Sequence, residues 1–473
     1  MPVLLRAPLA TENPTNNGTD LPGQALARRL GLFDTAMIVM GGIIGSGIFI
    51  NPYVVAQQVH TPLLILSAWG VGGLIALAGA FIYAELSSQS SASGGQYVYL
   101  RDAFHPSIAF LYGWALLLVI QTGGMAAVAV TFAKYFLELG HLAAGDRNAG
   151  LVAAIALSAL TLINCLGVRA GSTTQNVFMI LKLIAIGTLV VWGLTVSGPP
   201  HNETITAYAG LSSGMWPALA AFGAALIPVQ FAYGGWQTAC FVAGEVREPR
   251  KNLPRGLLLG VLGVIAVYLS VNVVCVHALG AQGLAQTKTP ASAVMRLALG
   301  ERGARFIAVG IAISTLGFLS QSMLTAPRVY FAMAQDRVFF KGLARLNRAR
   351  VPALAIALQG ALAIVIALSG RYEQILNYVV SVDVVFFALT AMCVFLFRSR
   401  ARTGESDEAR TFRIPGHPLT TLFFIIACAA VIFSTVYKYP RNSAIGLGIM
   451  LAGLPVYFLW GWWRKRNHPA PIL

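Results

Sequence analysis

Charged side chains are scarce in this chain. Asp, Glu, Lys and Arg make up 11% of its 473 residues, less than half of the roughly 25% that soluble globular proteins carry. Apolar residues make up 57%, and the mean hydropathy is +0.71. This composition excludes a soluble enzyme, a disordered scaffold and a fibrous protein. It indicates a protein that crosses a membrane several times.

Motifs for several kinds of chemistry are also missing. The sequence has no His-Glu-x-x-His motif, no paired carboxylates within the apolar segments and no phosphate-binding loop. Its five cysteines fall within or at the ends of apolar segments, so no disulfide framework is expected. These absences argue against a membrane-embedded enzyme, and they leave ATP-driven pumping by this chain unsupported. We expect no catalytic residue, no metal and no cofactor.

Long apolar segments dominate what is present. We interpret them as twelve helices that cross the lipid bilayer. They lie at residues 33–58, 62–88, 107–138, 149–167, 173–197, 213–244, 255–281, 303–334, 351–369, 372–397, 419–437 and 442–463.

The net charge of +16 follows a topological pattern. Of the 33 Lys and Arg residues, 23 lie on the side of the membrane shared by both termini, nine lie on the other side, and Lys182 lies inside a segment. An excess of basic residues is typical of the cytoplasmic side. We therefore predict cytoplasmic termini, and we expect no nucleic-acid partner for this charge.

Two segments contain glycine clusters near their centres. Residues 41–49 read Gly-Gly-Ile-Ile-Gly-Ser-Gly-Ile-Phe, and residues 231–236 read Phe-Ala-Tyr-Gly-Gly-Trp, just after Pro228. Glycine costs about 1 kcal/mol relative to alanine inside a helix, so both clusters favour local unwinding. Unwound backbone within a membrane is tolerated where a polar group binds it. The alternative interpretation is close helix packing, which small residues also permit.

The two clusters occupy corresponding positions. They lie in the first and sixth segments, which open two sets of five. A repeat with five crossings has inverted topology, and paired interrupted helices are typical of binding sites in secondary transporters. We therefore expect an N-terminal tail at 1–30, repeats at 31–200 and 210–400, two further helices at 415–465 and a C-terminal tail at 466–473. A channel would instead need rings of charge.

The chemistry of half-helix ends limits the ligand. An N-terminal end presents free N–H groups to a carboxylate, and a C-terminal end presents free carbonyls to an ammonium. A zwitterionic amino acid supplies both groups, whereas a neutral sugar would use neither. A polyamine or other organic cation, the alternative substrate, needs acidic side chains in the pocket, and none lies beside either glycine cluster.

These residues resemble a known family. Residues 41–49, 231–236 and 245–254 are similar to signatures of the amino acid–polyamine–organocation (APC) superfamily, nearest its L-type amino acid transporter (LAT) branch, and residues 83–86, 93–101 and 325–331 also match. The resemblance runs from about residue 28 to 465. It implies an all-α, LeuT-like fold with a five-plus-five inverted repeat, broken helices one and six, and two additional C-terminal helices.

The resemblance also implies a site and a setting. Phe231 is expected as an aromatic gate over the substrate. The outer loop at 141–148 has no cysteine that could link a glycoprotein, so we expect no disulfide-linked heavy subunit and a prokaryotic-type transporter in the bacterial inner membrane. Gln96 replaces an acidic residue common in the family. The expected substrate-binding residues are Ile43, Gly45, Ser46, Gly47, Phe231, Ala232 and Gly234.

Two charged residues lie within predicted helices. Lys182 is about ten residues into the fifth segment, a long way from the membrane surface. A family lysine here resembles a tethered sodium ion, which implies that Lys182 couples substrate binding to closure through carbonyls near Gly42 and hydroxyls such as Ser314 or Ser320. Asp383, in the tenth segment, is the other coupling candidate, and it either relays protons or hydrogen-bonds the broken helices.

Three more charges lie near the predicted cytoplasmic ends of segments. Glu85, Glu245 and Arg328 are interpreted either as inner-gate charges or as part of solvated loops. Together these features predict a secondary active transporter that moves amino acids across the plasma membrane by alternating access. Amino acid exchange and proton-coupled symport both stay open.

Overall fold

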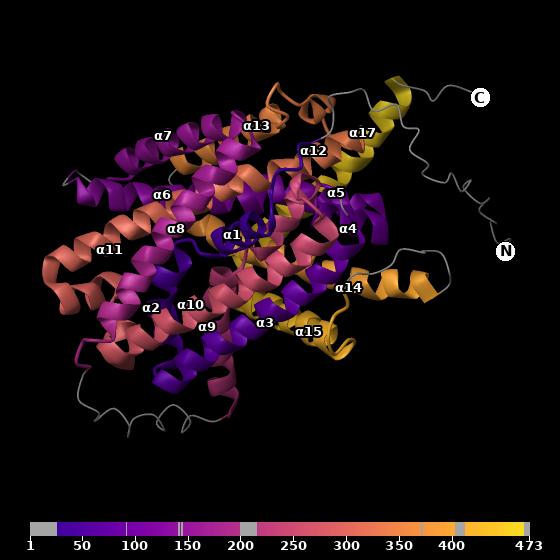
Figure 1. Ribbon diagram of the computed structural model, residues 1–473. Helices are drawn as coiled ribbons and strands as arrows, with labels where there is room; N and C mark the ends of the chain where they lie inside the picture. The colour runs from indigo at the N-terminus through magenta and orange to yellow at the C-terminus, as the bar shows by residue number, and fades with distance from the viewer. Residues whose placement is uncertain are drawn as a thin grey trace.

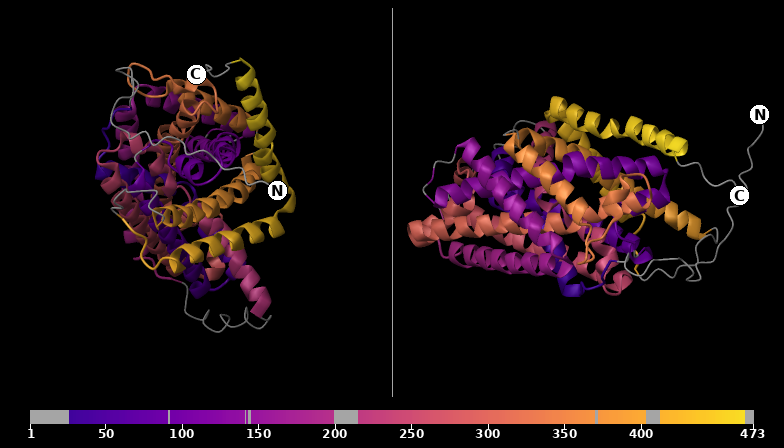
Figure 2. Two further views of the ribbon diagram at one scale, coloured as in Figure 1. Left: turned by 90° about the vertical axis from the view of Figure 1, so that its right-hand side faces the viewer. Right: turned by 90° about the horizontal axis from the view of Figure 1, so that it is seen from above.

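A computed structural model describes residues 26–90, 92–140, 142, 145–198, 215–369, 372–402 and 412–467. Within them the chain is helical, apart from turns and an isolated bridge between Leu30 and Val246. Figures 1 and 2 show the helices gathered into one bundle. Much of the predicted tails, at residues 1–25 and 468–473, and part of the predicted outer loop at 141–148 lie outside the described residues.

The helices follow the order of the predicted segments. The first segment is α1 (Leu32–Ile43) with α2 (Gly47–Val59), and the sixth is α9 (Met215–Tyr233) with the 3₁₀ helix η3 (Trp236–Glu245). The other segments are α3 (Pro62–Gln89), α5 (Pro106–Ala115) with the π-helix η1 (Leu116–Ile120) and α6 (Gln121–Leu139), α7 (Asp146–Cys165), α8 (Val168–Gly193), α10 (Pro249–Gln286), α11 (Pro290–Thr325) with α12 (Pro327–Gln335), α13 (Ala353–Leu368), α14 (Tyr372–Arg402), α15 (Leu419–Lys438), and α16 (Pro440–Leu451) with α17 (Gly453–Asn467). Two short helices, α4 (Gln96–Ala103) and η4 (Lys341–Ala344), lie in connections.

Ten helices within the described residues are long and apolar enough to cross a membrane, and the bent pair α1 and α2 makes eleven. The remaining candidate, α13, is apolar but has 16 residues. The all-helical, polytopic fold is therefore confirmed, whereas the count of twelve crossings stays a prediction.

Proline and capping residues explain where several helices begin. Proline is the first residue of α3, α5, α10, α11, α12 and α16, a position where its missing N–H breaks no helical hydrogen bond. Before α3, the Thr61 hydroxyl accepts a hydrogen bond from the Leu64 N–H at 3.3 Å, which caps the open first turn.

The outer surface of the bundle is apolar. Leu63, Ile155 and Phe433 are exposed by 76%, 70% and 73%, although each belongs to a membrane-length helix. Many other large apolar side chains are exposed on the same helices. A surface of this kind is stable against lipid tails and unfavourable in water.

The two broken helices pack against each other in crossed pairs. α2 packs along α9 and α1 packs along η3, so each half of one broken helix meets the opposite half of the other. α3 and α10, which hold corresponding places in the two sets of five, also pack along each other. This arrangement agrees with an inverted repeat, in which α1 corresponds to α9 and α2 to η3. The repeat boundaries stay a prediction.

Candidate functional site between the broken helices

The first break spans residues 44–46. α1 ends at Ile43, α2 begins at Gly47, and the pair is bent by 42°. The break is shorter than the glycine cluster, because residues 41 and 42 remain helical. Three carbonyls at the break accept hydrogen bonds from side chains of other helices: Ile43 from the Tyr268 hydroxyl at 3.0 Å, Ile44 from the Lys182 ammonium at 2.5 Å, and Gly45 from the Ser314 hydroxyl at 3.4 Å.

The second break lies between α9 and η3, at Gly234 and Gly235. Gly235 has a φ of +109°, a left-handed conformation that glycine adopts without steric cost. The nearby Ala232 carbonyl accepts a hydrogen bond from the Tyr268 hydroxyl at 3.1 Å. Because Tyr268 also contacts the Ile43 carbonyl, one hydroxyl lies between backbone groups of both broken helices.

The second break also frees the Phe231 carbonyl. In a continuous helix its donor would be the Gly235 N–H, but that N–H donates to the Gln237 side chain at 3.1 Å. No other hydrogen bond within the described residues engages the Phe231 carbonyl. Across the cavity, the N-cap Ser46 of α2 makes no side-chain cap hydrogen bond, so N–H groups of its first turn remain available.

The two breaks touch through glycine. A Cβ atom on Gly42 would lie 2.6 Å from the Gly235 carbonyl oxygen, and a Cβ atom on Gly235 would overlap the Gly42 carbonyl. Both interpretations of the clusters therefore hold, at different residues. Gly42 allows close packing, whereas Gly235 and residues 44–46 leave the helical conformation.

A cavity of about 120 Å³ lies between the breaks. Trp236 lines it as well, and its ring lies 5.3 Å from the Phe387 ring. The use of this cavity by a substrate, and of Phe231 as its gate, stay predictions. All seven residues expected at the site line the cavity: Ile43, Gly45, Ser46, Gly47, Phe231, Ala232 and Gly234.

Other walls come from the third and eighth segments, through residues that the sequence analysis did not single out. Gln121 lines the cavity from α6, directly after the π-helix η1, a geometry that is frequent at functional sites. Gln321 and Phe318 line it from α11. Gln121 and Gln321 are amide side chains within apolar segments, which is the signal that could have identified them.

Asp383 lines the same cavity from α14. Its Oδ1 atom is buried and has no hydrogen-bond partner within the described residues, and no hydrogen bond there joins Asp383 to either broken helix. The sequence argument that no acidic side chain lies beside either glycine cluster therefore does not extend to the whole cavity. Asp383 is far from both glycine clusters in the sequence, and the packing of α14 brings it to the cavity.

Lys182 lies behind the first break rather than in the cavity lining. Its side chain is fully buried on α8, and a Cβ atom on Gly317 of α11 would lie 3.1 Å from the Lys182 Cε atom. Lys182 thus lies between the broken first helix and α11, the eighth segment, as the resemblance implies.

Lys182 binds a backbone carbonyl near Gly42, as expected, but neither of the expected hydroxyls. Its ammonium binds the Ile44 carbonyl, two residues beyond Gly42. The Ser314 hydroxyl instead donates to the backbone of the break, and the Ser320 hydroxyl has no hydrogen-bond partner within the described residues. The role of Lys182 in coupling stays a prediction.

Charged pairs join helices at one end of the bundle, which we call the basic end and define by Arg101, Arg328, Arg337, Arg398 and Arg400. Arg328 and Glu245 form an ion pair with an Nε–Oε1 distance of 2.7 Å, and their side chains are 0% and 1% exposed. Glu85 forms a second pair with Arg398 at 2.6 Å and also accepts the Ile414 N–H. The solvated-loop interpretation of Glu85, Glu245 and Arg328 was therefore wrong.

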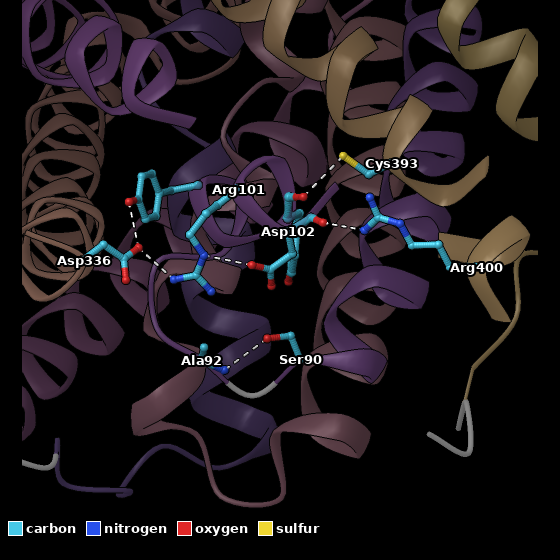
Figure 3. Close-up of polar contacts among 9 residues, drawn as sticks. Ser90, Ala92, Arg101, Asp102, Asp336, Cys393 and Arg400 are labelled. Atoms are coloured by element: carbon cyan, nitrogen blue, oxygen red, sulfur yellow. Dashed lines mark hydrogen bonds and ion pairs between the residues drawn. The ribbon is translucent and has the colours of Figure 1, made fainter. Parts of the chain in front are cut away.

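Residues of helix α4 form hydrogen bonds with residues of other segments at the basic end (Figure 3). Arg101 and the Tyr97 hydroxyl both bind Asp336, at 2.7 Å and 2.8 Å. Burial raises the pKa of the Tyr97 phenol, and the Asp336 carboxylate raises it further, so this hydroxyl stays a donor at neutral pH. Arg400 of α14 binds the Asp102 carbonyl at 2.6 Å.

The loop before α4 packs against the end of the second broken helix. Gly94 donates to the Phe241 carbonyl at 2.9 Å, and the Ser93 hydroxyl accepts the Gly244 N–H at 3.1 Å. Gln96 is fully buried, and neither polar atom of its side chain has a hydrogen-bond partner within the described residues. No group of three His, Cys, Asp or Glu side chains among the described residues could hold a metal ion.

Comparisons with known proteins match most of this chain. A family model described as amino acid permease matches residues 30–460. The serine/threonine exchanger SteT of Bacillus subtilis is 31% identical over 444 residues, which cover 92% of this chain and 97% of that protein. The human large neutral amino acids transporter small subunit 2 is 31% identical over 449 residues, 94% of this chain and 82% of that protein.

A third relative extends the range of similarity. The human b(0,+)-type amino acid transporter 1 is 27% identical over 462 residues, covering 95% of this chain and 92% of that protein. These relatives support the APC and LAT-like assignment, and they favour amino acids over the polyamine alternative. The chain belongs to the amino acid permease family and is a transporter of amino acids rather than an enzyme.

Proposed function

We propose that this chain exchanges amino acids across the bacterial inner membrane by alternating access, with the substrate held between the two broken helices. The observation that carries the proposal is the cavity that residues of both breaks line together. The exchange mode is supported by the Bacillus relative, which is named an exchanger and matches this chain almost end to end.

The backbone at the breaks suits both ends of an amino acid. The substrate carboxylate binds the first turn of α2, at the N–H groups of Ser46 and Gly47, where the helix dipole is positive. The substrate ammonium binds the Phe231 carbonyl, which lost its helical donor to Gln237. The half-buried Phe231 ring then covers the bound substrate as a gate.

Lys182 serves as a fixed cation in this proposal. Its ammonium donates a hydrogen bond to the freed Ile44 carbonyl and links α8 to the first break. Movement of α1 or α2 during alternating access changes this contact, so the charge couples substrate binding to the position of the broken helix.

Proton-coupled symport is the second candidate mode. The observation that favours it is Asp383, a carboxylate with an unpartnered oxygen in the cavity lining. A carboxylate there can take up a proton with the substrate and release it on the other side.

The transporter works without a disulfide-linked subunit in this proposal, although the human relative is named a small subunit. Cys240, Cys275, Cys393 and Cys428 are buried within the bundle, and Cys165 is half-buried at the end of α7. A single band at the monomer mass under non-reducing conditions, in membranes of the source cell, supports the proposal. A larger band that collapses on reduction contradicts it.

Uptake by liposomes containing the purified protein tests the proposal. Labelled amino acids are added to vesicles that are either empty or preloaded with unlabelled amino acids, with and without an inward proton gradient. Uptake that needs internal substrate and ignores the gradient supports exchange. Uptake into empty vesicles driven by the gradient shows symport instead, and the absence of any amino acid uptake overturns both modes.

A further inference from the structure

Asp383 stands out among the residues that line the cavity. Val379, Asp383 and Phe387 recur at four-residue intervals on α14, so they form one face of that helix. Both neighbours on this face are apolar, and no other Asp, Glu, Lys, Arg or His lines the cavity within the described residues. This wall belongs to neither broken helix.

Three side chains at the cavity hold a buried polar atom that has no partner within the described residues. They are Asp383 with its acceptor Oδ1, Gln230 with its donor Nε2, and Ser322 with its hydroxyl oxygen. Gln230 lines the same cavity from α9. Because buried polar atoms are nearly always hydrogen-bonded in folded proteins, an unpartnered acceptor and an unpartnered donor in one cavity indicate a ligand with both functions.

From this arrangement we infer that Asp383 selects amino acids whose side chain carries a hydroxyl group close to the backbone, by accepting the hydroxyl hydrogen bond. This inference deepens the proposed function and rests on it. The backbone groups at the two breaks hold the substrate's carboxylate and ammonium, so the substrate side chain is left to meet the wall formed by α14.

A hydroxyl fits this wall better than the other side chains. A hydroxyl donates one hydrogen bond and accepts others, so it supplies both the donor that Asp383 needs and an acceptor of the kind that Gln230 needs. A side-chain ammonium would satisfy only Asp383, because it has no acceptor. An apolar side chain would leave both groups unpaired. The cavity volume of about 120 Å³ also suits a small substrate, since a cavity of about 150 Å³ accommodates benzene.

Threonine and valine provide the test, because they have the same shape and differ in one hydroxyl. Exchange of each is measured in preloaded liposomes for the wild type, Asp383→Asn and Asp383→Leu. The control is Glu138→Gln on α6. Glu138 is exposed and does not line the cavity, so this variant removes one negative charge at a distance from the site. Size-exclusion profiles check that each variant is folded.

We expect the wild type and Glu138→Gln to prefer threonine over valine by at least about tenfold, since sites that hydrogen-bond a substrate strongly reject the analogue that lacks the group. Asp383→Asn keeps an acceptor oxygen and so keeps most of the preference. Asp383→Leu loses the preference while still exchanging valine.

Three results would overturn the inference. The first is that the wild type does not distinguish threonine from valine. The second is that Asp383→Leu keeps the preference for threonine. The third is that the wild type prefers 2,3-diaminopropionate to threonine and that Asp383→Asn does not. Exchange by the wild type separates failure of the inference from failure of the proposed function. If the wild type exchanges amino acids and one of these three results is found, the proposed function stands without the inference. If the wild type exchanges no amino acid, the proposed function fails.

Discussion

The ammonium of Lys182 donates a hydrogen bond of 2.5 Å to the carbonyl of Ile44, at the point where the first broken helix loses its regular backbone pairing. A charge within a membrane helix is costly unless a polar group receives it, and a freed carbonyl within a membrane is costly unless a donor reaches it. The contact removes both costs. The buried charge and the helix break therefore stabilise each other.

Replacement of Lys182 tests this dependence. We predict that Lys182→Ala is inserted into the membrane but loses uptake by at least about tenfold, because a hydrogen bond to a charged group contributes about 1.5–3 kcal/mol. Lys182→Met keeps most of the side-chain volume and should lose uptake equally, because the charge is absent. Wild-type rates in either variant would remove Lys182 from the mechanism.

Tyr268 links the two breaks, and its hydroxyl can be removed alone. Tyr268→Phe leaves carbonyls of Ile43 and Ala232 without this donor, so we predict substrate binding weaker by roughly tenfold, from about 1–3 kcal/mol per unsatisfied group. Equilibrium binding of a labelled amino acid measures the effect.

Tyr233→Phe is the matched control for this prediction. The Tyr233 side chain is also buried, but its hydroxyl has no hydrogen-bond partner within the described residues. Removal of that hydroxyl should leave binding and Tm unchanged. Equal losses of binding in Tyr268→Phe and Tyr233→Phe would show that the link between the breaks does not hold the site together.

The contact between Gly42 and Gly235 leaves no room for a side chain. Gly235→Ala adds a Cβ atom that overlaps the Gly42 carbonyl, at a φ of +109° that alanine rarely adopts. We predict a lower Tm for Gly235→Ala in detergent, together with loss of substrate binding. Gly187→Ala on α8 is the control, because nothing lies within 4 Å of a Cβ atom there. A Tm for Gly235→Ala that matches this control would contradict the close approach.

The buried pair of Arg328 and Glu245 joins α12 to the end of the second broken helix. Removal of one partner leaves an unpaired buried charge, so Glu245→Gln should destabilise the protein by about 3–5 kcal/mol. The double variant Glu245→Leu with Arg328→Met has no buried charge, and we predict that it recovers much of the lost Tm. A double variant less stable than either single variant would contradict the argument.

The sequence predicts the parts of this site whose signals are local. Glycine clusters identify both breaks, and a lysine in an apolar segment identifies Lys182. The sequence does not distinguish Tyr268 from other tyrosines, and it identifies Asp383 as a charge within a helix without placing it at the cavity. Their roles depend on which face each helix turns towards the breaks, and this orientation is determined by packing among distant helices.

The most direct test of the central claim is an experimental structure of the protein with a bound amino acid. The account predicts that the substrate lies in the cavity between the breaks, with its carboxylate on the N–H groups of Ser46 and Gly47 and its ammonium on the Phe231 carbonyl. An amino acid bound elsewhere, or bound in this cavity without contacts to the backbone of either break, would contradict the account.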